Sequence, residues 1–95
     1  SKNIGDDVYG TVSGIKRFGA FVELLDNGSD GFIPRNSIGS KPVRYDSRNN
    51  QLLIENNTIQ LGDIVLVEIL KTDVLTGGII LGLKEVNGTR WPTLV

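Results

Sequence analysis

Hydrophobic and polar residues alternate over short runs along this chain, and no apolar spacing typical of a helix extends over about ten residues. Alternation with a period of two predicts five strands, and a smaller hairpin within the connection between the third and the fourth. The five strands are expected at residues 8–16, 19–25, 31–33, 64–71 and 79–83, and the hairpin strands at residues 51–54 and 57–60. The side chains expected in the core are Ala20, Val22 and Leu24, then Val65, Val67 and Ile69, and finally Ile79, Leu81 and Leu83.

Turn residues separate the predicted strands. Asn27-Gly28 accepts the positive φ angles of a type I′ turn after the second strand, and Gly77-Gly78 permits positive φ before the fifth. Residues 36–60 are polar, rich in Asn and long for a connection in so small a domain. The pattern predicts an all-β fold: a five-stranded Greek-key OB-fold barrel with an elaborated loop and hairpin between strands 3 and 4. The strand count alone also admits an SH3-like barrel, but the position of the insertion favours the OB-fold.

A chain of 95 residues has room for one domain. We expect a lead-in at residues 1–7, the OB-fold domain at residues 8–84 and a C-terminal tail at residues 85–95. The tail contains Trp91-Pro92, which either docks back on the barrel or marks a boundary.

The composition excludes several classes of site. Cysteine and histidine are absent, so the chain has no disulfide, no thiolate ligand and no imidazole base. No apolar run approaches the length of a membrane span and no leader pattern opens the chain, so we expect a soluble, cytoplasmic protein with no membrane partner. Methionine is also absent, which favours a domain excised from a larger protein.

The acidic residues do not form a catalytic pattern. Asp6 and Asp7 are neighbours whose side chains would point to opposite faces of a strand, while Asp26 and Asp30 bracket a turn, where Asp is common. Asp63 also lies at a turn. No nucleophile has a base nearby in sequence, and the glycines match no phosphate-binding loop. We therefore expect no catalytic residue, no metal site and no enzymatic activity in this domain alone.

One aromatic residue lies on an unexpected face of its strand. Parity places Phe21 opposite Ala20, Val22 and Leu24, the expected core residues. An outward Phe with two cations nearby is typical of a platform on which nucleic-acid bases stack. The net charge of −1 argues against a broadly basic polyanion binder, so binding would depend on stacking and a local patch.

The order of motifs resembles the S1 RNA-binding domain along residues 4–84. The resemblance depends on the FGAFV strand, the Gly-Phe-Ile-Pro strand, Leu-Gly-Asp before the fourth strand and LGLK at the end of the fifth. It implies an OB barrel that binds single-stranded RNA on one face.

The resemblance also implies particular contact residues. Phe18 and Phe21 match the stacking aromatics of the family, and Asp73 matches an acidic position near the RNA. Pro34 and Gly78 stand where the family often has a histidine and an arginine. Two usual contact positions therefore lack their side chains, which lowers the expected affinity.

The insertion narrows the resemblance. Residues 43–63 contain a Tyr-Asp pair, an apolar hairpin and Leu-Gly-Asp, and are similar to the connection in the terminal RNA-binding domain of bacterial RNase II and exoribonuclease R enzymes. This implies a C-terminal S1 domain that helps to capture and hold RNA for a hydrolase degrading it from the 3′ end. Mg²⁺ would belong to the parent's catalytic domain, which with a cold-shock-type domain would adjoin this one. The isolated domain is expected to be monomeric and to need no cofactor.

The remaining candidates surround the two aromatics. A bend or bulge at Gly19 would bring Phe18 and Phe21, which have opposite parity, onto one face; alternatively, Phe18 caps the open end of the barrel. Cations nearby could contact phosphates or serve only as solvated surface residues, and one tyrosine could add a ring or simply pack in its loop. These residues are Lys16, Arg17, Arg35, Arg44, Arg48, Lys71 and Tyr45. A rival interpretation from another class is an OB-fold protein-interaction module, in which the Phe21 face or the long loop docks a protein.

Overall fold

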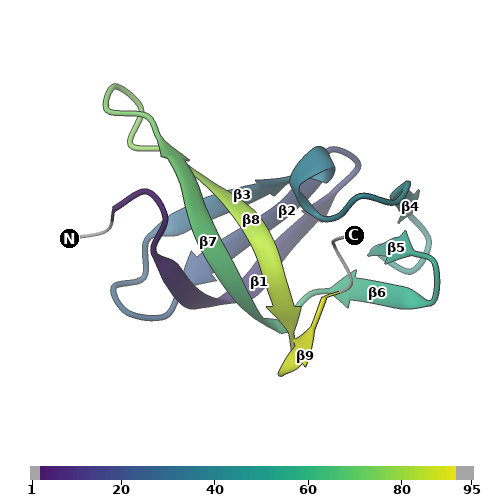
Figure 1. The fold of residues 1–95 in the computed structure, drawn as a ribbon. Helices are drawn as coiled ribbons and strands as arrows, with labels where there is room; N and C mark the ends of the chain where they lie inside the picture. Colours follow the sequence, from purple (N-terminus) through teal and green to yellow (C-terminus); the bar gives the residue numbers. More distant parts are fainter. Residues whose placement is uncertain (1–2, 92–95) are drawn as a thin grey trace.

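The chain forms a β-barrel with a small second sheet at one end, as the computed structural model of residues 3–91 shows (Figure 1). Its elements are β1 (Asp7–Lys16), β2 (Gly19–Leu24), β3 (Asp30–Pro34), the 3-10 turn η1 (Arg35–Ser37), β4 (Arg44–Asp46), β5 (Gln51–Ile54), β6 (Asn57–Gln60), β7 (Ile64–Thr72), β8 (Ile79–Val86) and β9 (Thr89–Arg90). Within residues 3–91, no helical segment has the length and apolar content that a membrane crossing requires.

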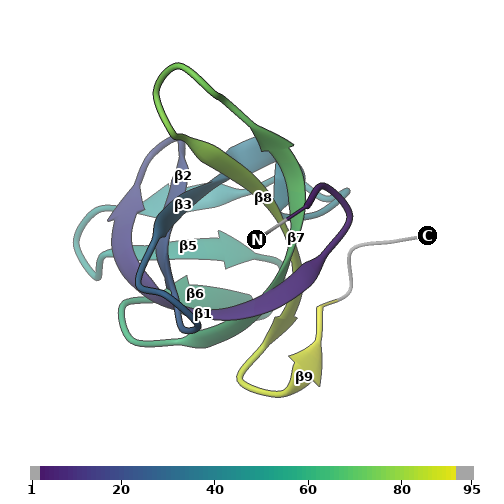
Figure 2. The ribbon, with the colours of Figure 1, turned by 90° about the vertical axis from the view of Figure 1, so that its left-hand side faces the viewer.

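Five strands close the barrel. β1 pairs with β2 and β7, β2 with β3, and β7 with β8, all antiparallel. A parallel pairing of Phe32 with Ile80 joins β3 to β8 and completes the ring of strands, which Figure 2 shows in a view turned by 90°. A closed five-stranded barrel of mixed pairing is the arrangement of an OB-fold. The predicted fold class is confirmed.

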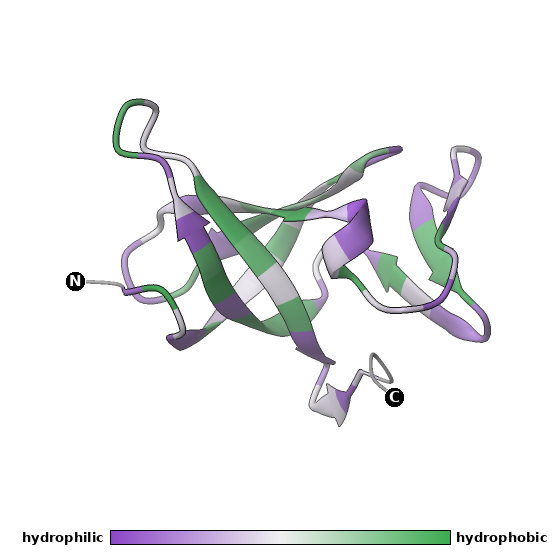
Figure 3. Ribbon diagram, turned by 45° about the horizontal axis from the view of Figure 1, so that its top comes forward, coloured by the Kyte–Doolittle hydropathy of each residue, from purple (hydrophilic) through white to green (hydrophobic). Residues whose placement is uncertain are grey.

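Alternate residues of the barrel strands form the core, as the pattern of the sequence predicted. Hydrophobic and hydrophilic bands alternate along the strands in Figure 3. Eight of the nine predicted core side chains are buried, and the ninth, Ile79, is half-buried against them. The eight are Ala20, Val22, Leu24, Val65, Val67, Ile69, Leu81 and Leu83. Each fully buried aliphatic side chain contributes about 1.5–3 kcal/mol through removal of apolar surface from water.

The second sheet closes one end of the barrel. The predicted hairpin is present as β5 and β6, and β4, which the sequence pattern did not indicate, pairs with β5 to give the order β4-β5-β6. Leu52, Ile54 and Ile59 are buried and belong to the same core cluster as the barrel residues. The insertion is therefore part of the folded core.

The hairpin turn predicted at Asn27-Gly28 is wrong in detail. Only Gly28 has a positive φ there, of 74°, whereas a type I′ turn requires positive φ at both central residues. The amides of Leu24 and Gly28 donate to the carbonyls of Ser29 and Leu24, at 2.7 and 2.9 Å, in a wider loop. A turn with positive φ at both residues occurs instead at Asn87-Gly88, where the angles are 50° and 83°.

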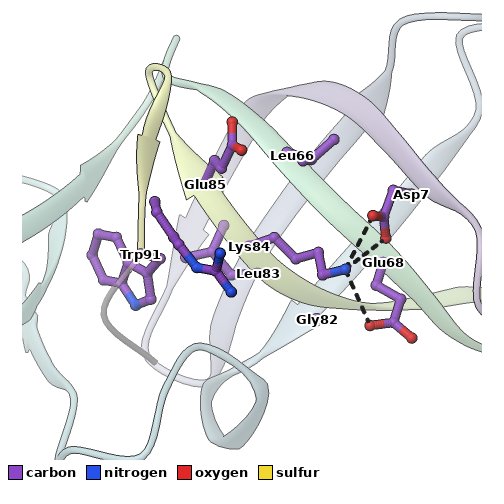
Figure 4. A pocket seen from close by; sticks show the side chains of 9 residues that line it. Asp7, Leu66, Glu68, Gly82, Leu83, Lys84, Glu85 and Trp91 are labelled. Atoms are coloured by element: carbon purple, nitrogen blue, oxygen red, sulfur yellow. Dashed lines mark hydrogen bonds and ion pairs between the residues drawn. The ribbon is translucent and has the colours of Figure 1, made fainter. Parts of the chain in front are cut away.

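The C-terminal segment folds back on the barrel. β8 extends to Val86, β9 pairs with it, and the Trp91 amide donates to the Lys84 carbonyl at 2.8 Å. Trp91 is 5% exposed and joins the core, so it docks; Pro92 lies outside the described residues. Trp91 and Lys84 line the same hollow, which Figure 4 shows from close by, and the Lys84 ammonium pairs with Asp7 at 3.0 Å and Glu68 at 4.0 Å. The domain boundaries themselves stay predictions.

Candidate nucleic-acid interface

Three phenylalanine rings lie in a continuous row on the barrel surface. The centroid of the Phe32 ring, in β3, is 5.6 Å from that of Phe18, in the β1–β2 turn, and 5.0 Å from that of Phe21, in β2. Phe18 and Phe21 are 60% and 38% exposed, and Phe32 is half-buried between them. These separations are typical of tilted aromatic pairs. A row of exposed rings offers successive faces for base stacking.

Phe32 is absent from the candidates found in the sequence, although its position was readable there. Ile33 is a core residue, so strand parity places the preceding Phe32 on the outer face. In the sheet, Phe32 lies directly opposite Phe21, as cross-strand neighbours whose side chains can touch. The register that pairs Phe21 with Phe32 depends on the length of the β2–β3 loop. The two-residue turn predicted at residues 27–28 implies a different loop length and therefore a different register.

A glycine at position 19 lets the first ring join the other two. Gly19 has a φ of 151°, and a Cβ there would lie 2.6 Å from Cζ of Phe32 and in severe overlap with the Ile33 carbonyl oxygen. The pairing of β1 with β2 is irregular between Val12 and Gly14 and not at Gly19, so of the predicted bend or bulge at Gly19 the bulge is wrong, whereas the φ of Gly19 is consistent with a bend. Because Phe18 lies in the turn before β2, strand parity does not apply to it.

A second glycine packs against Phe21, at the other end of the row. Gly14 of β1 lies opposite Phe21, and a Cβ built on Gly14 would be 3.3 Å from the Phe21 ring. The ring therefore covers the bare backbone of Gly14, an arrangement by which an aromatic compensates for a glycine in a strand. This packing holds Phe21 in place while one face stays open to solvent.

Arg17 links the ring row to the second sheet. Its guanidinium carbon lies 5.1 Å from the centroid of the Tyr45 ring, a cation–π arrangement. Tyr45 is half-buried against the core, and Arg17 lies over its ring. Arg17 therefore covers the ring that was predicted as an additional stacking surface. The contact fixes the position of a cation one residue from Phe18.

Arg35 holds the turn that carries Phe18. Its backbone amide donates to the Phe18 carbonyl at 2.9 Å, and its side chain donates from Nη1 to the Arg17 carbonyl at 3.3 Å and from Nη2 to the Val43 carbonyl. A guanidinium has five N–H donors, so these bonds leave others for a ligand. The structure thus gives Arg35 a structural task in addition to the phosphate contact predicted for it.

An open groove continues from Phe18, between the β1–β2 turn and residues 39–43. These two segments lie side by side near η1 in Figure 1. The charged residues that line the groove are Arg17, Arg35 and Lys41, all cationic. Lys41 was not among the residues singled out from the sequence, because it lies in an irregular segment where parity gives no signal.

The other predicted cations are exposed around this region. Lys16 ends β1, and Arg44 and Arg48 belong to β4 and the turn after it. Lys71 lies opposite Ile80 of β8, which in turn lies opposite Phe32 of β3. Adjacent strands are about 4.8 Å apart, so Lys71 is two strands from the ring row. Their RNA contacts stay predictions.

Asp73 organises the loop between β7 and β8. Its Oδ1 accepts hydrogen bonds from the amides of Leu75 at 3.0 Å and Thr76 at 3.4 Å, and the Leu75 bond is the main cause of a lowered pKa of Asp73. Asp73 also lines a second hollow, beside Gly78, whose charged lining residues are Asp26 and Asp73, both acidic. The charged residues among 3–91 that line this hollow are therefore acidic, and Lys71 is close enough to contribute to the lowered pKa of Asp73.

The sequence model of the S1 RNA binding domain family matches residues 1–84. Among curated relatives, Ribonuclease R of Vibrio parahaemolyticus is 28% identical over 74 residues, which are 76% of this chain and 9% of that protein. Translation initiation factor 2 subunit alpha of Methanocaldococcus jannaschii is 36% identical over 84 residues, 87% of this chain and 28% of that protein. The chain thus spans a small part of each relative.

Comparison with solved structures finds the same two kinds of protein, RNase R and the alpha subunit of initiation factor 2. Mycoplasma genitalium RNase R, solved in its apo form and in complex with ribose-methylated single-stranded RNA, matches with a TM-score of 0.77 and 26% identity, over 84% of this chain and 13% of that one. The intact alpha subunit of aIF2 from Pyrococcus abyssi matches with a TM-score of 0.69 and 27% identity, over 87% of this chain and 29% of that one.

Proposed function

The chain belongs to the S1 RNA-binding domain family, and on that premise we propose that it binds single-stranded RNA along the row of Phe18, Phe32 and Phe21. The observation that carries this proposal is the continuity of the three rings, which are 5.6 and 5.0 Å apart from centroid to centroid. Stacking contributes about 1–3 kcal/mol per base and tolerates any base, because every base has a π-face.

Phosphates would be held by cations beside the row. Arg17 and Arg35 flank Phe18 and are fixed by contacts with the protein, so their charges are positioned before RNA arrives. Cations at phosphates set affinity, salt dependence and register, and carry no base preference. The geometry therefore favours a sequence-tolerant holding site.

We further propose that this S1 domain belongs to a 3′-to-5′ exoribonuclease of the RNase R type, in which it captures and holds the substrate. The similarity to Ribonuclease R and the TM-score of 0.77 with Mycoplasma genitalium RNase R support this. The initiation factor relative has the higher identity, at 36%, but its counterpart from Pyrococcus abyssi has the lower TM-score, at 0.69. In this proposal the domain itself is monomeric, needs no cofactor and works in the cytoplasm. It adjoins a cold-shock-type domain and a catalytic domain of the parent protein, and Mg²⁺ binds to the catalytic domain.

A protein-interaction role without RNA binding is not favoured, because the family and the RNase R neighbours both point to RNA. Fluorescence anisotropy with a labelled single-stranded oligo-U separates the two. We expect binding that weakens as salt is raised and that falls about 5- to 150-fold in Phe21→Ala, the equivalent of one stacked base. Tyr9→Ala is the matched control, because Tyr9 is a 54% exposed aromatic of the same barrel outside the ring row. Absence of RNA binding by the wild type would refute the proposal.

A further inference from the structure

We propose that bound RNA continues past Phe18 into the groove between the β1–β2 turn and residues 39–43, where Arg17 and Lys41 contact its phosphates. This inference rests on the proposed RNA-binding function and adds a second, electrostatic part to the site. The groove starts at the ring of Phe18, and the charged residues among 3–91 that line it are all cationic. Such a local group of cations is notable in a chain whose net charge is −1.

The two ends of the β2–β3 strand pair differ in the charge of their lining residues. β2 and β3 run antiparallel, so the β1–β2 turn and the end of β3 lie at one end of the pair and the β2–β3 loop lies at the other. Among residues 3–91, the charged residues that line the hollow at the β2–β3 loop are Asp26 and Asp73, whereas those that line the groove at the opposite end are Arg17, Arg35 and Lys41. The cations of the groove therefore attract the phosphates of an RNA strand that is longer than the row.

Contacts within the protein position the arginines of the groove, and other donors in the groove are left available for anions. Tyr45 holds the Arg17 guanidinium, and Arg35 is held by the carbonyls of Arg17 and Val43. Lys41 is exposed, and within residues 3–91 its side chain makes no ion pair or hydrogen bond. The backbone amides of residues 39–41 likewise donate no hydrogen bond to any described residue. Unused amides beside cations are suitable donors to phosphate oxygens.

The length of the RNA tests this inference. One OB-fold accommodates about 4–16 nucleotides, so an oligo-U of about four nucleotides is expected to occupy the ring row, and one of about ten to reach the groove as well. In NMR titrations of the chain, amide signals of residues 39–41 should shift with the longer RNA and stay unchanged with the shorter one, while signals of the ring row shift with both.

Lys41→Ala supplies an independent readout. It should weaken binding of the longer RNA about fivefold at low salt and reduce the slope of log K against log salt by about 0.7, the effect of one phosphate contact on a single strand. Arg90→Ala is the control, because it removes the same charge from an exposed residue of β9 in a different hollow. It should leave both quantities unchanged.

Each result decides the matter. If the longer RNA shifts the ring row but not residues 39–41, and Lys41→Ala behaves as Arg90→Ala does, the groove is not part of the RNA path and the inference is overturned. If neither RNA produces any shift, the proposed function fails as well, so the two failures are distinguishable.

Discussion

Phe32→Leu should weaken RNA binding strongly while leaving the barrel folded. The middle ring lies 5.0 and 5.6 Å from its two neighbours, measured between centroids. Its removal therefore deletes one stacking surface and also removes the aromatic contact that each flanking ring makes. Loss of one stacked base alone is worth about 1–3 kcal/mol, or about 5- to 150-fold in Kd. Leucine keeps an aliphatic side chain at this half-buried position, so the loss of stability is limited to the aromatic pairing, about 0.5–1.5 kcal/mol for each of two pairs.

The assay for this prediction is anisotropy with labelled oligo-U, run beside thermal unfolding of the same samples. Tyr9→Leu makes the same chemical change at a 54% exposed aromatic outside the row, and should alter Kd less than twofold. If Phe32→Leu binds as tightly as the wild type while Phe18→Ala and Phe21→Ala lose affinity, Phe32 is a packing residue and the three-ring argument is wrong.

Two further predictions concern the frame of the site. Gly19→Ala should lower the free energy of unfolding by at least about 2 kcal/mol, because the new Cβ would overlap the Ile33 carbonyl and press on Phe32; thermal melting measures this, and an unchanged melting temperature would refute it. Asp73 has a lowered pKa in the fold, chiefly through the Leu75 amide, so its stabilising effect is present above the ordinary value of 3.8 and is lost as pH falls through the folded value. In urea titrations the stability difference between wild type and Asp73→Asn should therefore be largest near neutral pH and shrink in acid; a difference independent of pH would contradict the assignment.

The alternation of apolar and polar residues was sufficient to predict the strands of the barrel, because one face of each strand is buried. Val65, Val67 and Ile69 illustrate this: their alternation with exposed or half-buried neighbours follows directly from a closed core. The hairpin of β5 and β6 was also predictable at its observed residues, since apolar positions flank a short turn. β4 was missed because its three residues, Arg44–Asp46, are too few and too polar to show a period.

The site was less predictable, because it depends on contacts between distant segments. Two Asn-Gly pairs are equivalent as local signals, but the tight turn forms at residues 87–88 and not at residues 27–28. The register of the β2–β3 pair, and with it the contact of Phe21 with Phe32, follows from the actual loop length. The bonds of Arg35 to two backbone carbonyls depend on where the insertion places Val43. No local pattern carries that information.

The most direct test of the RNA-binding surface is an aromatic NMR titration of the chain with single-stranded oligo-A at low salt. Ring currents from stacked adenines should shift the ring signals of Phe18, Phe21 and Phe32 together, with a common Kd, and should leave the ring of Tyr9 unchanged. Saturating RNA that leaves all three phenylalanine signals in place, or that shifts Tyr9 as much as the ring row, would contradict the account.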